Sequence, residues 1–372
     1  MTAVGPLPVD AIIDLENGKT SDPEALFFVN NNVPNRLEGI VIGEDIVPKR
    51  KKTMADGLRP LLASMKLFGL YFNRRSETAG EDLGKSSRKW NATTIYGAVV
   101  VTLLWINSVR MLSAFTREDK FGMMLFNKLV MIVWAIQCAT SQTAFYAASF
   151  SGRLAVVLRQ TLDDSCARHA QKFAVVLATV AWTIITVSVA CMIYVDFFTS
   201  FTSDVVIAPF ENHIILPDPL VPHIIAQLVM FYQVSAYIFS QAMTFVLAMI
   251  FSHQFKKVSA DLACCLDNPR HHVSEVDIET FRQKHQSIAM TVSDLDNTLM
   301  FSNASAFCCQ LFCFIIMLYI VIFYHSVMVD PVTIASHVFW ILLMFFGLTL
   351  TAASGIVVHH YVSLLNVCQL FA

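Results

Sequence analysis

Charged side chains are scarce in this sequence. They make up only 15% of the 372 residues, whereas soluble domains carry about 25%. Hydrophobic residues make up 55%, and the mean hydropathy is +0.57. This composition indicates a membrane protein. The 26 basic residues nearly balance the 28 acidic ones, and no basic stripe alternates with aromatic residues. The sequence therefore predicts no nucleic-acid partner.

Signatures of catalysis and of cofactor binding are also missing. The chain has no phosphate-binding loop, no glycine pattern for dinucleotides, no H-E-x-x-H pair and no G-x-S-x-G turn. Two pairs of adjacent histidines, at 271–272 and 359–360, are present. Neighbours on a helix point about 100° apart, so neither pair forms a metal site alone. We therefore expect no enzyme activity, no cofactor and no metal.

Residues 1–57 contain little that could form a core. They are polar, with scattered prolines and acids, and they end in the basic run Pro48–Lys52. A segment of this kind cannot bury enough apolar surface to fold alone. We expect a disordered cytoplasmic tail over 1–57 and a transmembrane receptor domain over 58–372. Leu58–Phe72 is too short to span a membrane, and its composition predicts an amphipathic helix on the membrane surface.

Long apolar segments are what the rest of the chain has in abundance. A helix needs about 20 apolar residues to cross the hydrocarbon core, and six segments reach that length. The predicted fold class is an all-α, polytopic membrane protein with six transmembrane helices. The predicted spans are 92–114, 123–150, 173–202, 221–251, 303–326 and 333–358.

Lysine and arginine in the loops predict the orientation, because cytoplasmic loops are enriched in them. Basic residues gather before the first span, between the second and third, and between the fourth and fifth. Loops three–four and five–six contain neither residue type. We therefore expect a multi-pass protein of the plasma membrane with its N-terminus in the cytoplasm.

The polar segment 252–302 carries a second pattern. Apolar residues and one histidine recur at spacings of three and four, as in a heptad seam that runs into the fifth span. These residues are Ile278, Phe281, His285, Ile288, Val292, Leu295 and Leu299. Such a seam needs a packing partner. It can join subunits in a cytoplasmic bundle or pack within the same chain, and the sequence leaves both interpretations open.

Polar side chains inside the apolar segments are the candidates for function. Gln233, Tyr237 and Gln241 form one stripe on the fourth span, Gln142 lies in the second, and Asp196 is an acid deep in the third. Amides in hydrocarbon must find hydrogen-bond partners. They can bond between helices, or they can line a pocket for a small-molecule ligand. For the second case we predict Gln233, Tyr237, Gln142 and Asp196 as ligand-binding residues.

The chain resembles the insect gustatory-receptor family and its gustatory-receptor-like relatives in other invertebrates. "RPLLASMKLFGLYF" resembles the segment before that family's first helix. "FRQKHQSIAMTVSDLDNTL" (Phe281–Leu299) resembles the segment before its fifth helix. The internal N-terminus and the cytoplasmic helix extensions fit the same architecture.

The resemblance implies a ligand-gated cation channel that works in chemosensation, such as taste. Members of the family are tetramers that join through their cytoplasmic helices. Each subunit holds its ligand in a pocket that faces outward. The expected partners are therefore a small molecule, membrane lipid, and further subunits in a homo- or hetero-tetramer.

The family's pore-lining seventh helix carries Thr-Tyr, five apolar residues and Gln-Phe. Tyr361, Gln369 and Phe371 resemble that motif with altered spacing, but the last apolar segment here runs from outside to inside. We therefore expect this chain to lack the pore helix.

Two other function classes remain open. One is a G-protein-coupled receptor, which would need seven spans and an external N-terminus. The other is a six-helix transporter, which would fit better with internal repeats or broken helices.

Overall fold

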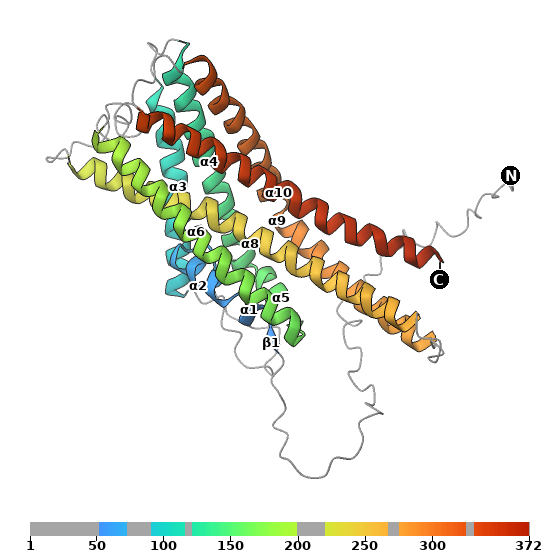
Figure 1. Cartoon of the computed structure of the whole chain (residues 1–372). Coiled ribbons are helices and arrows are strands. Elements are labelled where there is room, and N and C mark those ends of the chain that lie inside the picture. The colour runs from blue at the N-terminus through green and yellow to red at the C-terminus, as the bar shows by residue number, and fades with distance from the viewer. Residues whose placement is uncertain are drawn as a thin grey trace, which may run out of the picture. The chain divides into compact units, whose positions relative to one another are not determined.

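The computed structural model describes residues 52–72, 91–115, 121–198, 220–266, 275–324 and 331–371. Most of the predicted tail, 1–57, lies outside these ranges, and of it only 52–57 are described. Helices dominate the described residues (Figure 1). In chain order the elements are β1 (Lys52–Thr53), α1 (Met54–Gly57), α2 (Arg59–Leu67), α3 (Ala92–Met111), η4 (Leu112–Ala114), α4 (Met123–Phe150), α5 (Arg153–Leu158), β2 (Thr161–Leu162), α6 (Asp164–Phe198), α8 (Leu220–Leu266), α9 (Glu275–Phe323) and α10 (Pro331–Phe371).

Six stretches of helix in the described ranges are long and apolar enough to cross a membrane. They lie in α3–η4, α4, α6, α8, α9 and α10, which confirms the predicted all-α polytopic fold. Several helices extend beyond the apolar spans predicted for them. α6 begins at Asp164 rather than 173, because Cys166, Ala167 and Ala170 are buried and continue its packed face. α10 continues past 358 to Phe371.

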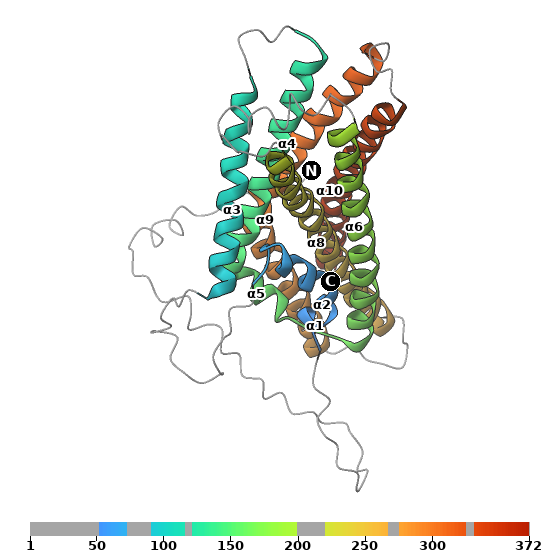
Figure 2. The same cartoon turned by 90° about the vertical axis from the view of Figure 1, so that its left-hand side faces the viewer.

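α8 is the central helix of the bundle. It contacts α3, α4, α6, α9 and α10, and Figure 2 shows it between α3 and α6. In the most apolar window of α8, 78% of the residues are buried, whereas the other five spans have 17% to 56%. A helix that is apolar on all sides belongs in a core, so most side chains in the middle of α8 are enclosed by protein.

The short sheet fixes the described N-terminal segment to the start of α6. β1 pairs antiparallel with β2, with Lys52 opposite Leu162. Thr53 then forms a capping box with Asp56, in which each side chain accepts a hydrogen bond from the other residue's backbone. Met54, the first residue of α1, is fully buried. This arrangement delivers α2 to the side of α6.

α2 is amphipathic as expected, but its apolar face is buried in the bundle rather than in the membrane surface. Leu61 and Met65 are fully buried, and α2 contacts α6 and α8. Phe68, next to the end of α2, has its ring centroid 5.6 Å from that of Trp182 and 5.5 Å from that of Phe239. The prediction of a surface helix was wrong because the sequence does not show that α6 and α8 cover this face.

The predicted seam packs within the chain. α9 runs unbroken from Glu275 to Phe323, as the pattern predicted. Seam residues Ile288 and Leu299 are buried, and the His285 ring lies 5.3 Å from the ring of Phe255 on α8. The extensions of α8 and α9 therefore cover each other along the seam (Figure 1). By contrast, Phe301 on α9 does not belong to the seam, and its side chain is 74% exposed.

Candidate functional site

A buried polar cluster lies where α8, α9 and α10 meet. Tyr237 on α8 is 1% exposed. Its hydroxyl accepts a hydrogen bond from Gln310 Nε2 on α9 at 3.3 Å and donates to Met344 Sδ on α10 at 3.8 Å. One turn further along α8, Gln241 Oε1 accepts from Thr351 Oγ1 at 2.8 Å. The three helices are therefore linked by polar contacts at the depth of Tyr237.

A small cavity of about 40 Å³ adjoins this cluster. Its walls come from α6, α8 and α10 and are mostly aliphatic. The lining residues are Leu177, Val180, Ala181, Ile184, Tyr237, Ile238, Gln241, Ala242, Leu343, Phe346, Gly347 and Leu350. A space of this size holds water, whereas pockets for organic ligands measure about 300–1,000 Å³. A larger ligand would therefore require the walls to move apart.

Gly347 sets the distance between α10 and this cluster. A Cβ atom placed on Gly347 would lie 2.5 Å from the Tyr237 hydroxyl oxygen and 3.1 Å from Gln310 Nε2. A contact of 2.5 Å is shorter than real Cβ atoms show, and a contact of 3.1 Å is unusually tight. The missing side chain thus makes room for the phenol of Tyr237 and the amide of Gln310.

Gln233 lies one helical turn from Tyr237 on α8. It is fully buried, and neither of its amide atoms has a hydrogen-bond partner in the described part of the chain. Gln137 on α4 is in the same condition. A buried amide without a partner costs about 1–3 kcal/mol. These amides are thus available to a polar occupant of the bundle.

The predicted stripe of Gln233, Tyr237 and Gln241 does face the interior, since the first two are buried and the third is half-buried. Tyr237 lines the cavity, and Gln233 is one turn away. Gln142 is elsewhere: its Nε2 donates to the Phe68 carbonyl at 3.0 Å, beside the end of α2. Asp196 belongs to α6, but its side chain lies outside the described residues.

Gln310, Gly347 and Thr351 are members of the cluster that we did not predict as ligand-binding residues, although Gln310 is one of the polar side chains within the apolar segments. One signal could have found the last two. Gly347, Thr351 and Gly355 repeat at intervals of four, and such small residues let membrane helices approach closely. Gln310 is an isolated amide in a long apolar helix, and its position relative to Tyr237 depends on the packing of α8 against α9.

Gln233 and Gln142 are both buried, but their substitution should have opposite effects on stability. Gln233→Leu removes an amide without partners, so we expect the free energy of unfolding to rise by about 1 kcal/mol. Gln142→Leu strands the buried Phe68 carbonyl, so we expect a fall of about 1 kcal/mol. A dodecyl sulfate titration of each purified variant, followed by circular dichroism, measures both. Equal changes of the same sign would contradict the assignment of their environments.

Within the described ranges, no group of three or more His, Cys, Asp or Glu residues is arranged to hold a metal ion. The hydrogen-bonding groups of the candidate site are instead two amides, a phenol and a hydroxyl. Such neutral groups orient uncharged polar ligands through hydrogen bonds.

The fold has a counterpart among solved structures. No known family model matches the chain, and no curated protein matches its sequence. The chain is similar in structure to the insect olfactory receptor OR5 from Machilis hrabei, with a TM-score of 0.56 and 13% sequence identity. The match covers 82% of this chain and 80% of the receptor chain. At this identity the similarity shows that the two chains share a fold of membrane-spanning helices.

Proposed function

We propose that the chain is a chemosensory receptor subunit of the gustatory-receptor type, which binds a small organic molecule beside Tyr237 and thereby gates a cation channel. The observation that carries this proposal is the polar cluster around Tyr237, which adjoins a cavity between α6, α8 and α10. The fold shared with an insect olfactory receptor supports it. The subunits would assemble as tetramers through the extensions of α8 and α9, in the plasma membrane, with cytoplasmic N-termini.

The chemistry of the cluster indicates the class of ligand. The cavity walls are aliphatic, and the buried amide of Gln233 has a donor and an acceptor without partners in the described residues. A charged ligand would pay a large desolvation cost in such surroundings. We therefore expect an uncharged, mostly apolar molecule with one or two hydrogen-bonding groups. Binding would open the cavity by displacing Leu343 or Phe346, which line it from α10.

The proposal predicts that two conservative substitutions reduce ligand sensitivity. Tyr237→Phe removes only the hydroxyl, and Gln233→Leu removes only the amide. Each loses one hydrogen bond to the ligand, so we expect the half-maximal concentration to rise about tenfold, which corresponds to about 1.4 kcal/mol. Binding of uncharged tastants and odorants to membranes of cells that express the chain measures the shift, and this readout does not require a pore helix.

Surface labelling of the same cells controls for expression. The matched control is Thr143→Val, which removes the hydroxyl that accepts an exposed hydrogen bond from Trp105 Nε1, away from the cavity. We expect it to leave the dose–response curve unchanged. Identical curves for the wild type and both test variants would refute binding at Tyr237.

A further inference from the structure

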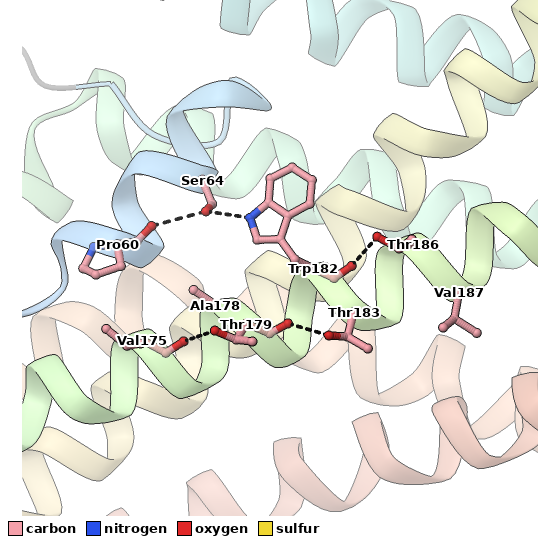
Figure 3. A pocket seen from close by; sticks show the side chains of 9 residues that line it. All are labelled: Pro60, Ser64, Val175, Ala178, Thr179, Trp182, Thr183, Thr186 and Val187. Carbon is pink, nitrogen blue, oxygen red and sulfur yellow. Dashed lines mark hydrogen bonds between the residues drawn. The ribbon is translucent and has the colours of Figure 1, made fainter.

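A second and larger hollow lies on the outer side of α6, where α2 packs against it. It is an open groove of about 570 Å³, which is within the range of ligand sites. Figure 3 shows its walls. Pro60 and Ser64 come from α2, and the other residues come from the stretch of α6 between Val175 and Val187. The lining residues are Pro60, Ser64, Val175, Ala178, Thr179, Trp182, Thr183, Thr186 and Val187.

The groove contains hydroxyl groups, but they are already engaged. Thr179, Thr183 and Thr186 each donate to the backbone carbonyl of the preceding turn, at 2.8–3.0 Å. Ser64 Oγ donates to the Pro60 carbonyl at 3.2 Å and accepts from Trp182 Nε1 at 3.0 Å. Figure 3 shows these bonds as dashed lines. The surface that remains consists of methyl groups and the indole ring, so it favours an apolar occupant.

Two cations precede the groove on its face of α6, one turn after the exposed acid Asp164 that begins the helix. Arg168, Lys172, Val175, Thr179, Thr183 and Thr186 follow one another at spacings of three and four. Residues so spaced lie on one face of a helix. Arg168 and Lys172 are exposed, and Lys172 directly precedes the predicted apolar span. The face thus offers two cations at the membrane interface, followed by the apolar groove, which continues from them into the membrane.

Two cations followed by an apolar groove match the anionic headgroup and the acyl chain of an anionic phospholipid. A headgroup phosphate at the interface would contact Arg168 and Lys172, because guanidinium and ammonium groups bind phosphate. One acyl chain would run along the groove over Ala178, beside Trp182. A protein helix would not use the two cations in this way, and a zwitterionic lipid would use them less well.

We infer that the groove between α2 and α6 is a binding site for one anionic phospholipid of the leaflet that contacts Arg168 and Lys172. The lipid would bridge α2 and α6 on the side away from the Tyr237 cavity, so the site is independent of the proposed chemosensory ligand. The interaction holds whether or not the chain forms a channel.

Native mass spectrometry of the full chain tests the inference. The chain is released from vesicles of equal phosphatidylglycerol and phosphatidylcholine, and the lipids that it retains are counted. We expect one retained phosphatidylglycerol per chain. Thr179→Trp fills the groove and should lower its retention about tenfold, which corresponds to about 1.4 kcal/mol or about two buried methylenes. The control Val176→Trp, at an exposed position outside the groove, should retain the lipid.

Charge variants test the headgroup. The double variant Arg168→Gln/Lys172→Gln should reduce the preference for phosphatidylglycerol over phosphatidylcholine about tenfold. Lys256→Gln, which removes an exposed cation from the extension of α8, should not change it. Equal retention of the two lipids by the wild type would overturn the inference. Equal loss in the Thr179 and Val176 variants would overturn it as well.

Photocrosslinking tests the inference even if Thr179→Trp fails to fold. It uses a phosphatidylglycerol with a diazirine on its acyl chain. Illumination of the wild-type chain should label residues 175–187 on the face of Thr179 and Thr183. Labels spread evenly over the exposed faces of α6 would show an unspecific lipid layer. Crosslinks to a second chain would show a protein occupant. Either result would refute the lipid site.

Discussion

Gly347→Ala is expected to lower the free energy of unfolding by about 2 kcal/mol, because overpacking a core costs up to about 3 kcal/mol and the preference of a helix for alanine over glycine offsets about 1 kcal/mol. The new Cβ would lie 2.5 Å from the Tyr237 hydroxyl oxygen. Tyr237 is fixed in place, since α8 is enclosed by other helices and the phenol is 1% exposed. α10 must therefore move away from α8, which also stretches the contact between Thr351 and Gln241.

A second substitution should reverse much of this loss. Tyr237→Phe removes the oxygen that the new methyl group would meet, so Gly347→Ala should cost much less in the Tyr237→Phe background. A double-mutant cycle measures this coupling. We expect an interaction energy of about 1–2 kcal/mol, because the two changes relieve one steric conflict. The measurement is the dodecyl sulfate titration of the wild type, both single variants and the double variant.

Gly355→Ala is the matched control on the same helix. Among the described residues, apart from the chain neighbours and the backbone of α10 itself, no atom lies within 4 Å of the position that a Cβ would take on Gly355. Alanine is favoured over glycine in a helix by about 1 kcal/mol, so this variant should equal the wild type or be slightly more stable. Additive losses in the double-mutant cycle, or equal effects at Gly347 and Gly355, would show that Gly347 does not control the approach of α10.

The contrast between these glycines shows what can be predicted from the sequence. Apolar length predicted every span, because the requirement to cross hydrocarbon acts on each helix separately. The stripe at Gln233 and Tyr237 was predicted to share a face because the helical repeat alone determines that. Nothing local distinguishes Gly347 from Gly355. A Cβ on Gly347 would meet Tyr237, whereas a Cβ on Gly355 would meet no other described element, and the difference arises from the packing of α10.

Dependence on tertiary packing also explains where the candidate ligand residues lie. Gln142 and Gln233 are both amides in apolar helices, and we predicted both as ligand-binding residues. In the fold, Gln142 bonds to the carbonyl of Phe68 on a segment 74 residues earlier in the chain. That partner depends on how the end of α2 enters the bundle. Sequence periodicity places a residue on a face, but the partner of that face is a property of the tertiary structure.

Gly69→Ala is expected to lower the free energy of unfolding by about 3 kcal/mol, the sum of backbone strain and overpacking. Gly69 ends α2 with φ of 69°, a left-handed conformation that costs other residues about 1–2 kcal/mol. The end of α2 is a Schellman motif: Leu70 N–H bonds to the Met65 carbonyl at 3.0 Å, and Gly69 N–H bonds to the Lys66 carbonyl at 3.2 Å.

Close packing adds to the strain at Gly69. A Cβ there would lie 3.1 Å from the Cα atom of Gly97 on α3 and 3.6 Å from Gln142 Nε2. The first of these atoms is backbone and cannot rotate away. α3 and the α2 segment would have to separate, which would weaken the bond from Gln142 Nε2 to the Phe68 carbonyl and the ring contacts of Phe68. The effect therefore extends beyond the turn itself.

Gly152 separates the two contributions. It also has a positive φ, at 78°, but in the part of the chain that the structure describes no atom other than those of its chain neighbours lies within 4 Å of the position of a Cβ on it. Gly152→Ala should therefore lower the free energy of unfolding by the strain alone, about 1 kcal/mol. The difference between the two alanine variants, measured in the same dodecyl sulfate titration, gives the cost of crowding α2 against α3. Equal losses at Gly69 and Gly152 would mean that α2 tolerates displacement from α3, and that its close packing is not needed for the stability of the bundle.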